Sequence, residues 1–167
     1  MAYTNKTYIA FDADSDIHYY RLMQAWKKND NASFNFYDAH DLTNIMSWST
    51  ENSIKKSLQE RLRNAKNFIL LVGEKTKFLH KFVRWEIEQA IERGLPIIVV
   101  NLNGRRYKDE DLCPAVLDDA LAIHISFNQK IIEKALNEWT ELHFSYVVQK
   151  KTGPYRYNEE VYKNLGL

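Results

Sequence analysis

Short apolar runs alternate with polar segments along this chain, and the pattern predicts alternating strands and helices. Runs of aliphatic and aromatic residues predict five strands, at residues 8–11, 33–38, 66–72, 96–101 and 121–126. Between them, apolar residues recur three or four positions apart, which is the period of a buried helix face. This spacing predicts helices at residues 17–28, 52–64, 78–93 and 128–148, with a shorter one at 114–120.

The order of these elements predicts the fold class. Residues 67–100 follow the pattern strand, helix, strand, and a connection of this kind makes the two strands parallel. Its repetition is typical of an α/β, three-layer, doubly wound sandwich around a five-stranded parallel sheet, the flavodoxin-like arrangement. Such folds bind ligands outside the carboxyl ends of their strands. The expected site loops are therefore residues 12–16, 38–51, 73–77 and 101–113.

Composition divides the chain into one domain and a tail. The 167 residues suffice for a single domain with a sizeable core. Residues 1–148 carry all the predicted elements, whereas residues 149–167 are polar and contain tyrosines. We expect a domain over residues 1–148, followed by a C-terminal extension that is partly ordered at best.

Charge and cysteine content limit the class of protein. The formal net charge is +1, so we expect neither nucleic acid nor an acidic membrane as a partner. Cys113 is the one cysteine, which rules out an internal disulfide and suits a reducing cytosol. No apolar stretch approaches the ~20 residues of a membrane span, and no signal peptide is visible. We expect a cytoplasmic protein.

The predicted helix at residues 78–93 carries the main candidate residue, Glu86. The buried face of this helix is expected to contain five apolar side chains: Phe82, Val83, Ile87, Ala90 and Ile91. Glu86 borders that face and follows Trp85. A glutamate in this position is either a solvated helix charge or the working carboxylate of a site. Spacing alone favours the solvated charge.

The acidic segment DADSD after the first strand allows several interpretations. A calcium-binding EF-hand loop is excluded, because its glycine and glutamate positions hold Ile17 and Met23. Asp12 and Asp14 also suit a phosphotransferase of the haloacid dehalogenase kind, but the rest of that motif is incomplete. Capping of the next helix by Ser15 or Asp16 is the structural alternative. The histidines and Cys113 show no metal-ligand spacing, so we expect no metal site.

The segment NFILLVGEKTKFLHKFVRWEIEQAIERGLPIIVV resembles the third strand, loop and following helix of TIR and TIR-like domains. Residues 82–87 fit their pattern of an aromatic residue, Trp and Glu-Ile, and YIAFDADSD and FNFYDAHD resemble their first two strands. The best match is to bacterial TIR-like proteins of the Thoeris anti-phage type, over roughly residues 8–139.

This resemblance implies a reaction and a set of site residues. Catalytic members cleave NAD at the nicotinamide–ribose bond, and Glu86 matches their essential glutamate. Phe11 and Trp48 are expected beside the nicotinamide and ribose, although Trp48 equally suits packing of its own loop. The further substrate-binding candidates are Asp12, Asp38, Ser49, Thr76 and Trp85. The NAD phosphates are expected near Lys75 or Arg84. NAD is the substrate, so no cofactor is expected.

The resemblance also implies partners and leaves two alternatives. Thoeris-type members produce an ADP-ribose-derived, often cyclic, signal for a separate effector protein, and catalytic TIR domains often need self-association. The first alternative is a non-catalytic TIR-like interaction module, with contacts through residues 39–51 and helix surfaces. The second is an enzyme like the nucleoside deoxyribosyltransferases, which uses a glutamate nucleophile on a ribose carbon.

Overall fold

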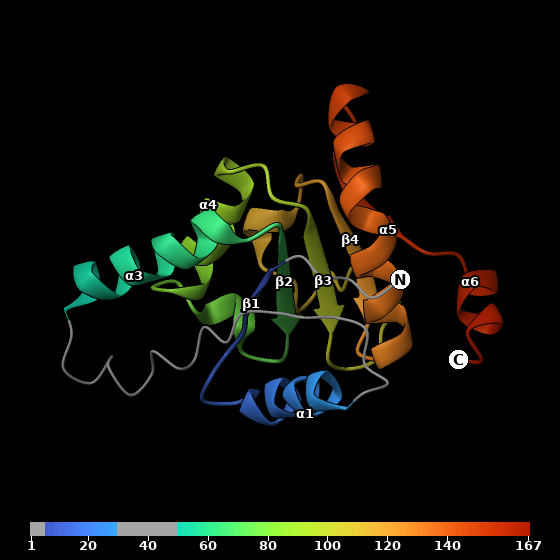
Figure 1. Cartoon of the computed structure of the whole chain (residues 1–167), viewed down its shortest axis with the longest axis horizontal. Helices are drawn as coiled ribbons and strands as arrows, with labels where there is room; N and C mark the ends of the chain where they lie inside the picture. The colour runs from blue at the N-terminus through green and yellow to red at the C-terminus, as the bar shows by residue number, and fades with distance from the viewer. Residues whose placement is uncertain (1–5, 30–49) are drawn as a thin grey trace.

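The computed structural model describes residues 6–29 and 50–167, and their strands form one parallel sheet (Figure 1). The strands lie side by side in chain order: β1 (Thr7–Ala10), β2 (Asn67–Val72), β3 (Ile97–Asn101), β4 (Ala122–Ser126) and β5 (Pro154–Arg156). The predicted α/β fold with a five-stranded parallel sheet is therefore confirmed. The predicted strand at residues 33–38 lies outside the described residues.

Helices cover both faces of the sheet and make the three layers. One face packs against α1 (Ile17–Lys28), α5 (Gln129–Val148) and α6 (Glu159–Asn164). The other face packs against α3 (Glu51–Asn64), α4 (Val83–Glu92) and the 3-10 turn η3 (Ala115–Leu117). Figure 1 shows α3 and α4 on one side of the sheet and α5 on the other. Because both faces are covered, β2 and β3 are buried throughout, which explains their continuous apolar sequences.

The helix that carries Glu86 begins later than predicted. The chain leaves β2 through a 3-10 turn, η2 (Thr76–Phe78), and α4 starts only at Val83. The Thr76 hydroxyl accepts a hydrogen bond from the Gly73 amide at 2.9 Å, which stabilises this turn in place of a longer helix. Ile91 was expected in the core but is 40% exposed. Gly94 has a φ of +66° just past the helix end, as the predicted cap requires.

The expectation that residues 149–167 are only partly ordered is wrong. Strand β5 pairs in parallel with β4, and α6 follows it. Tyr155 packs against Tyr146 and Trp139, with ring centroids 4.8 Å and 5.7 Å apart. Tyr162 on α6 is completely buried. Through these aromatic contacts, residues 149–167 pack onto the core. The domain boundary after residue 148 stays a prediction.

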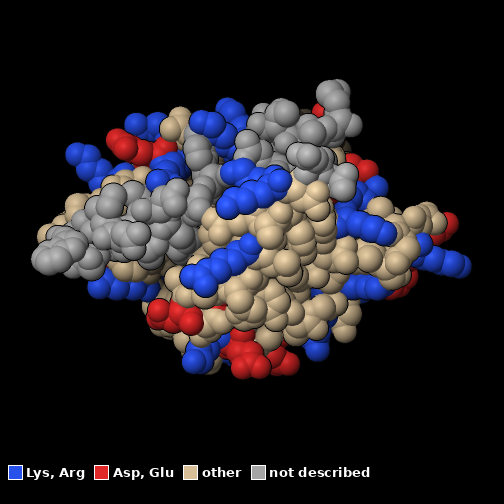
Figure 2. Space-filling view, turned by 60° about the horizontal axis from the view of Figure 1, so that its bottom comes forward, with Lys and Arg blue, Asp and Glu red and all other residues tan. Residues whose placement is uncertain are grey.

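The charged surface is mixed in sign. On the face drawn in Figure 2, Lys and Arg side chains are scattered over uncharged residues, and Asp and Glu side chains lie toward the edges. In the part of the chain that the structure describes, no helix is long and apolar enough to cross a membrane.

We predict that Tyr162→Ala destabilises the protein by about 3–5 kcal/mol, as truncation of a large buried aromatic side chain usually does. The variant loses the core contacts of α6 and the hydrogen bond that the Tyr162 hydroxyl accepts from the Ser126 amide. Chemical denaturation measures the change. Tyr107 is 45% exposed, so Tyr107→Ala is the control and should cost less than about 1 kcal/mol. A loss below about 1 kcal/mol in Tyr162→Ala as well would show that burial of Tyr162 adds little stability.

Candidate active site

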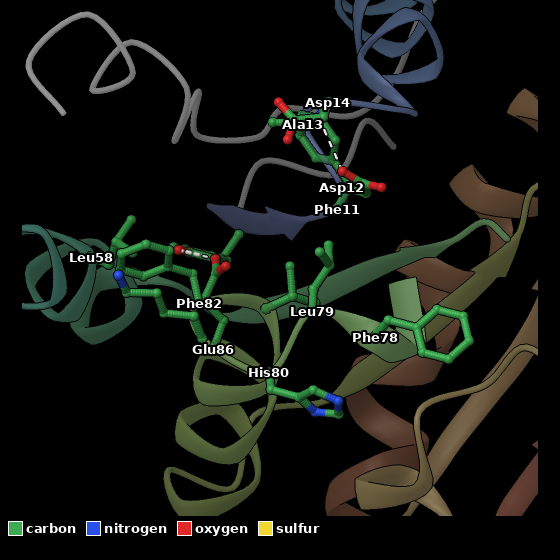
Figure 3. Close-up of a pocket in the computed structure, with 13 residues that line it drawn as sticks. Phe11, Asp12, Ala13, Asp14, Leu58, Phe78, Leu79, His80, Phe82 and Glu86 are labelled. Atoms are coloured by element: carbon green, nitrogen blue, oxygen red, sulfur yellow. Dashed lines mark hydrogen bonds between the residues drawn. The ribbon is translucent and has the colours of Figure 1, made fainter. Parts of the chain in front are cut away.

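A cavity of about 350 Å³ lies at the carboxyl end of β1, beside the start of α4 (Figure 3). Its walls come from β1 and the turn after it, from α3, and from the segment that runs from the end of η2 into the first turn of α4. The lining residues are Tyr8, Phe11, Asp12, Ala13, Asp14, Leu58, Phe78, Leu79, His80, Lys81, Phe82, Val83 and Glu86. The cavity lies where ligands bind in folds of this class. Its volume is at the lower end of the range for small-molecule sites.

Glu86 is one of two buried carboxylates in the lining of this cavity, and the other is Asp12, which is 4% exposed. Glu86 lies in the first turn of α4 and is 8% exposed. The hydroxyl of Tyr8, on β1, donates a hydrogen bond to Glu86 Oε2. Among residues 6–29 and 50–167, the other oxygen, Oε1, has no hydrogen-bond partner. One oxygen of the carboxylate is thus held by the protein, and the other is open to a ligand.

Burial raises the pKa of Glu86 to about 7, whereas the hydrogen bond from Tyr8 lowers it. The carboxyl group therefore changes its charge near neutral pH. Burial and the negative charge of Glu86 also raise the pKa of Tyr8 well above its usual value, so the phenol keeps its proton. A carboxyl group with a strongly perturbed pKa in a cavity is a candidate catalytic group.

The wall around Glu86 is largely apolar. The lining contains aliphatic and aromatic side chains that pack on the same face of the sheet as α4: Leu58, Leu79, Phe82 and Val83. The ring of Phe11 is fixed by stacking on Tyr20, with centroids 4.7 Å apart. Figure 3 shows the side chains of Phe78 and His80 directed away from Glu86. The carboxylate thus faces a pocket that suits a flat, weakly polar group.

The acidic turn after β1 has a structural role that the sequence only partly predicted. Asp12 lines the cavity, and its Oδ1 accepts hydrogen bonds from the amides of Asp14 and Ser15 at 3.1 Å and 3.3 Å. Asp16 occupies the N-cap of α1, but its side chain makes no capping hydrogen bond, so the expected capping role is not seen.

Asp16 instead lies against Gly73. A Cβ at Gly73 would be 2.4 Å from Asp16 Oδ2, so this position has no room for a side chain. Burial, followed by the charge of Asp12, raises the pKa of Asp16. In the described segments, no three His, Cys, Asp or Glu side chains are arranged to hold a metal ion.

Lys81 is the basic side chain that lines the cavity with Glu86. Its Nζ lies 3.3 Å from Glu51 Oε2, and its side chain is 64% exposed. The expected phosphate-binding residues, Lys75 and Arg84, do not line this cavity. Arg84 pairs with Glu88 at 3.0 Å and lines a neighbouring cavity of about 280 Å³.

The structure brings together three of the predicted site residues, Phe11, Asp12 and Glu86. Thr76 lies in the turn after β2, and Trp85 packs beside α3 under the amine of Lys55. Neither of them lines the cavity that contains Glu86. The remaining candidates, Asp38, Trp48 and Ser49, lie outside the described residues.

Sequence reasoning missed Tyr8 and Lys81 as site residues. Tyr8 had one sequence signal, because a buried tyrosine hydroxyl needs a hydrogen-bond partner. That signal did not identify the partner, which is 78 positions away. Lys81 had no signal, because it is one of several lysines near the predicted helix.

Comparison with known protein families agrees with the sequence resemblance. The family model for the TIR-like domain of the Thoeris protein ThsB matches residues 8–107, more than half of the chain. The matched region runs from β1 to the loop after β3 and includes every residue that lines the cavity. Strands β4 and β5 and helices α5 and α6 follow it. The chain therefore belongs to the TIR-like domain family of the Thoeris protein ThsB.

Proposed function

We propose that this domain cleaves the nicotinamide–ribose bond of NAD and that Glu86 is the catalytic carboxylate. Family membership supports a role in Thoeris anti-phage defence. One observation carries the proposed reaction: a buried carboxylate with one oxygen held by Tyr8 and the other open to an apolar cavity. That arrangement suits a reaction in which positive charge develops on a sugar.

The chemistry follows from charge development. When the bond between nicotinamide and ribose C1′ breaks, its electron pair moves to the ring nitrogen, and the pyridinium leaves as neutral nicotinamide. Positive charge then develops on the ribose, and a carboxylate beneath the ring stabilises it. This attraction is stronger in a buried site than in water. Because the leaving group takes no proton, one carboxylate suffices.

Two features of the cavity support placing the nicotinamide end of NAD beside Glu86. The apolar side chains in the lining on the α4 face, Leu58, Leu79 and Phe82 among them, match a flat aromatic ring. The carboxylates of Asp12 and Asp14 disfavour phosphate near the turn after β1, whereas Lys81 offers a cation at the same cavity. We therefore assign Lys81, in place of Lys75 or Arg84, to the diphosphate.

The outcome after bond cleavage stays a prediction. Capture of the ribose by water gives ADP-ribose, and capture by an atom of the ADP-ribose itself gives a cyclic product. We propose that the product is a signal for a separate effector protein and that self-association accompanies activity in the cytoplasm.

The deoxyribosyltransferase-like reaction is the second candidate function. A carboxylate with one oxygen fixed and the other free also suits direct attack on the C1′ carbon of a deoxynucleoside. Base exchange without NAD distinguishes this reaction from NAD cleavage. The interaction-module alternative requires no turnover at all.

We predict that Glu86→Gln lowers NAD consumption by roughly 10²–10³-fold, because it removes the charge that stabilises the transition state. The amide keeps the shape of the side chain and still accepts the Tyr8 hydrogen bond. NAD loss is measured at high protein concentration, with and without lysate from phage-infected cells, and mass spectrometry identifies the product. Glu88→Gln is the control, since Glu88 is exposed on the same helix and pairs with Arg84.

The free energies of unfolding of wild type and Glu86→Gln show whether the variant is folded. The folded-state pKa of Glu86 is about 7, above its ordinary 4.5, so its contribution to stability is present below pH 4.5 and is lost as the pH rises through 7. Wild type should therefore lose up to about 3 kcal/mol relative to Glu86→Gln between pH 4 and pH 8. Undiminished activity in a folded Glu86→Gln variant would show that Glu86 is not the catalytic carboxylate. If the wild-type protein also consumes no NAD, the proposal of NAD cleavage fails. The interaction module or the base-exchange reaction then replaces it.

We predict that the rate of NAD cleavage depends on pH with an acid limb near 7. Burial raises the pKa of Glu86 to about 7, and the reaction needs the charged form. Below that pH, kcat/KM should fall about tenfold per pH unit, and above it the rate should level off. A profile at constant ionic strength measures this limb. A limb in the ordinary range of a solvated glutamate would contradict a buried catalytic Glu86.

We predict that Lys81→Ala raises the KM for NAD by about tenfold and leaves kcat within about threefold, because the lysine binds the diphosphate in both ground and transition states. The difference in KM between wild type and Lys81→Ala should shrink at high salt, since the Lys81 side chain is 64% exposed and salt screens its charge. Steady-state kinetics at two salt concentrations test it. Lys75→Ala is the matched control, because Lys75 is exposed and outside the cavity lining. The same KM in both variants would exclude Lys81 as the phosphate contact.

A further inference from the structure

We propose that Tyr8 is a positioning residue for Glu86: its hydroxyl holds one carboxylate oxygen, leaves the other open to the substrate and favours the charged form. Its importance for catalysis rests on the proposed NAD reaction. Its effect on the Glu86 carboxylate does not, and the experiment below separates the two.

The position of the Tyr8 hydroxyl is fixed by the sheet. Tyr8 lies on β1 opposite Phe68 of β2, and the two rings stack with centroids 5.7 Å and planes 9° apart. The Tyr8 side chain is completely buried. Glu86 approaches from α4, which packs against β1. A hydrogen bond between a strand and a helix aligns a reactive group better than one between loops.

The contact determines which carboxylate oxygen is free to react. The Tyr8 hydroxyl donates to Oε2, so rotation of the carboxylate is restricted and Oε1 is the oxygen with no partner among the described residues. The pKa of Tyr8 is raised by its burial and by the charge of Glu86. The phenol therefore stays a donor throughout the neutral range. Nicotinamide needs no proton to leave, so orientation and charge stabilisation, not proton transfer, are the functions of this hydroxyl.

Other charged groups face the same pair and must be separated from Tyr8 in the test. Asp12 and Asp14 come from the turn after β1, and His80 and Lys81 come from the segment before α4. From α3, Arg61 acts electrostatically on Tyr8. His80 is directed away from Glu86 in Figure 3. A His80→Gln variant shows whether its imidazole contributes to a measured pH profile.

The test is a direct titration of Glu86 by NMR in protein labelled with ¹³C at the glutamate carboxyl carbons. Its signal is assigned by its loss in Glu86→Gln. In Tyr8→Phe, we expect the ratio of carboxylate to carboxylic acid at a given pH to fall about tenfold, because a hydrogen bond to the charged form is lost. Replacement of Tyr8 by 3-fluorotyrosine, a more acidic donor, should shift the ratio the opposite way. Tyr155→Phe is the control, since Tyr155 packs with α5 on the opposite face.

The outcomes separate the two proposals. An unchanged titration of Glu86 in Tyr8→Phe overturns the role of Tyr8. If Tyr8→Phe does not fold, the protein with 3-fluorotyrosine at position 8 is the test. An unchanged titration of Glu86 in that protein also overturns the role of Tyr8. If the titration shifts as expected and wild type consumes no NAD, the proposed function fails but the positioning role stands. If NAD is consumed, the acid limb of kcat/KM should move with the titration, and KM at the pH optimum should stay within about threefold.

Discussion

The hydrogen bond between the Tyr8 hydroxyl and the Glu86 carboxylate joins the first strand of the sheet to α4. It compensates part of the cost of burying a carboxyl group, whose ionised form is disfavoured away from water. A glutamate buried without such a partner would be largely neutral at pH 7. The contact therefore lets a carboxyl group that water does not screen be charged in part at neutral pH.

The sheet is covered by helices on both faces, and this packing fixes the positions of Tyr8 and Glu86. Strands β2 and β3 are buried on both faces, so they cannot shift without exposing aliphatic side chains. Tyr8 is fixed by its register with Phe68, and Val83, Ile87 and Ala90 hold α4 against the same face. The position of Glu86 thus depends on the hydrophobic core, and the cavity beside it opens where β1 ends.

The cavity is chemically asymmetric. Besides Glu86 on α4, its acidic side chains are Asp12 and Asp14 from the turn after β1, whereas Lys81 comes from the segment before α4. Asp12 also holds the backbone of its own turn, and Asp16 fills the space above Gly73. The acidic sequence after β1 therefore shapes the cavity wall as well as its charge. A ligand with a flat apolar end and an anionic group matches this arrangement.

The sequence by itself determined the parallel α/β class, because continuous apolar runs joined by helices allow few other arrangements. The family resemblance singled out Glu86 as the candidate catalytic residue. Tertiary structure alone decided its environment: the partner Tyr8 is 78 positions away, and burial of the pair depends on packing of α4 against β1. It also decided that α4 starts at Val83, since the Gly73–Thr76 turn comes first, and that β5 and α6 complete the fold. Local patterns report which face of an element is apolar, but contacts between distant segments form only when the chain is packed.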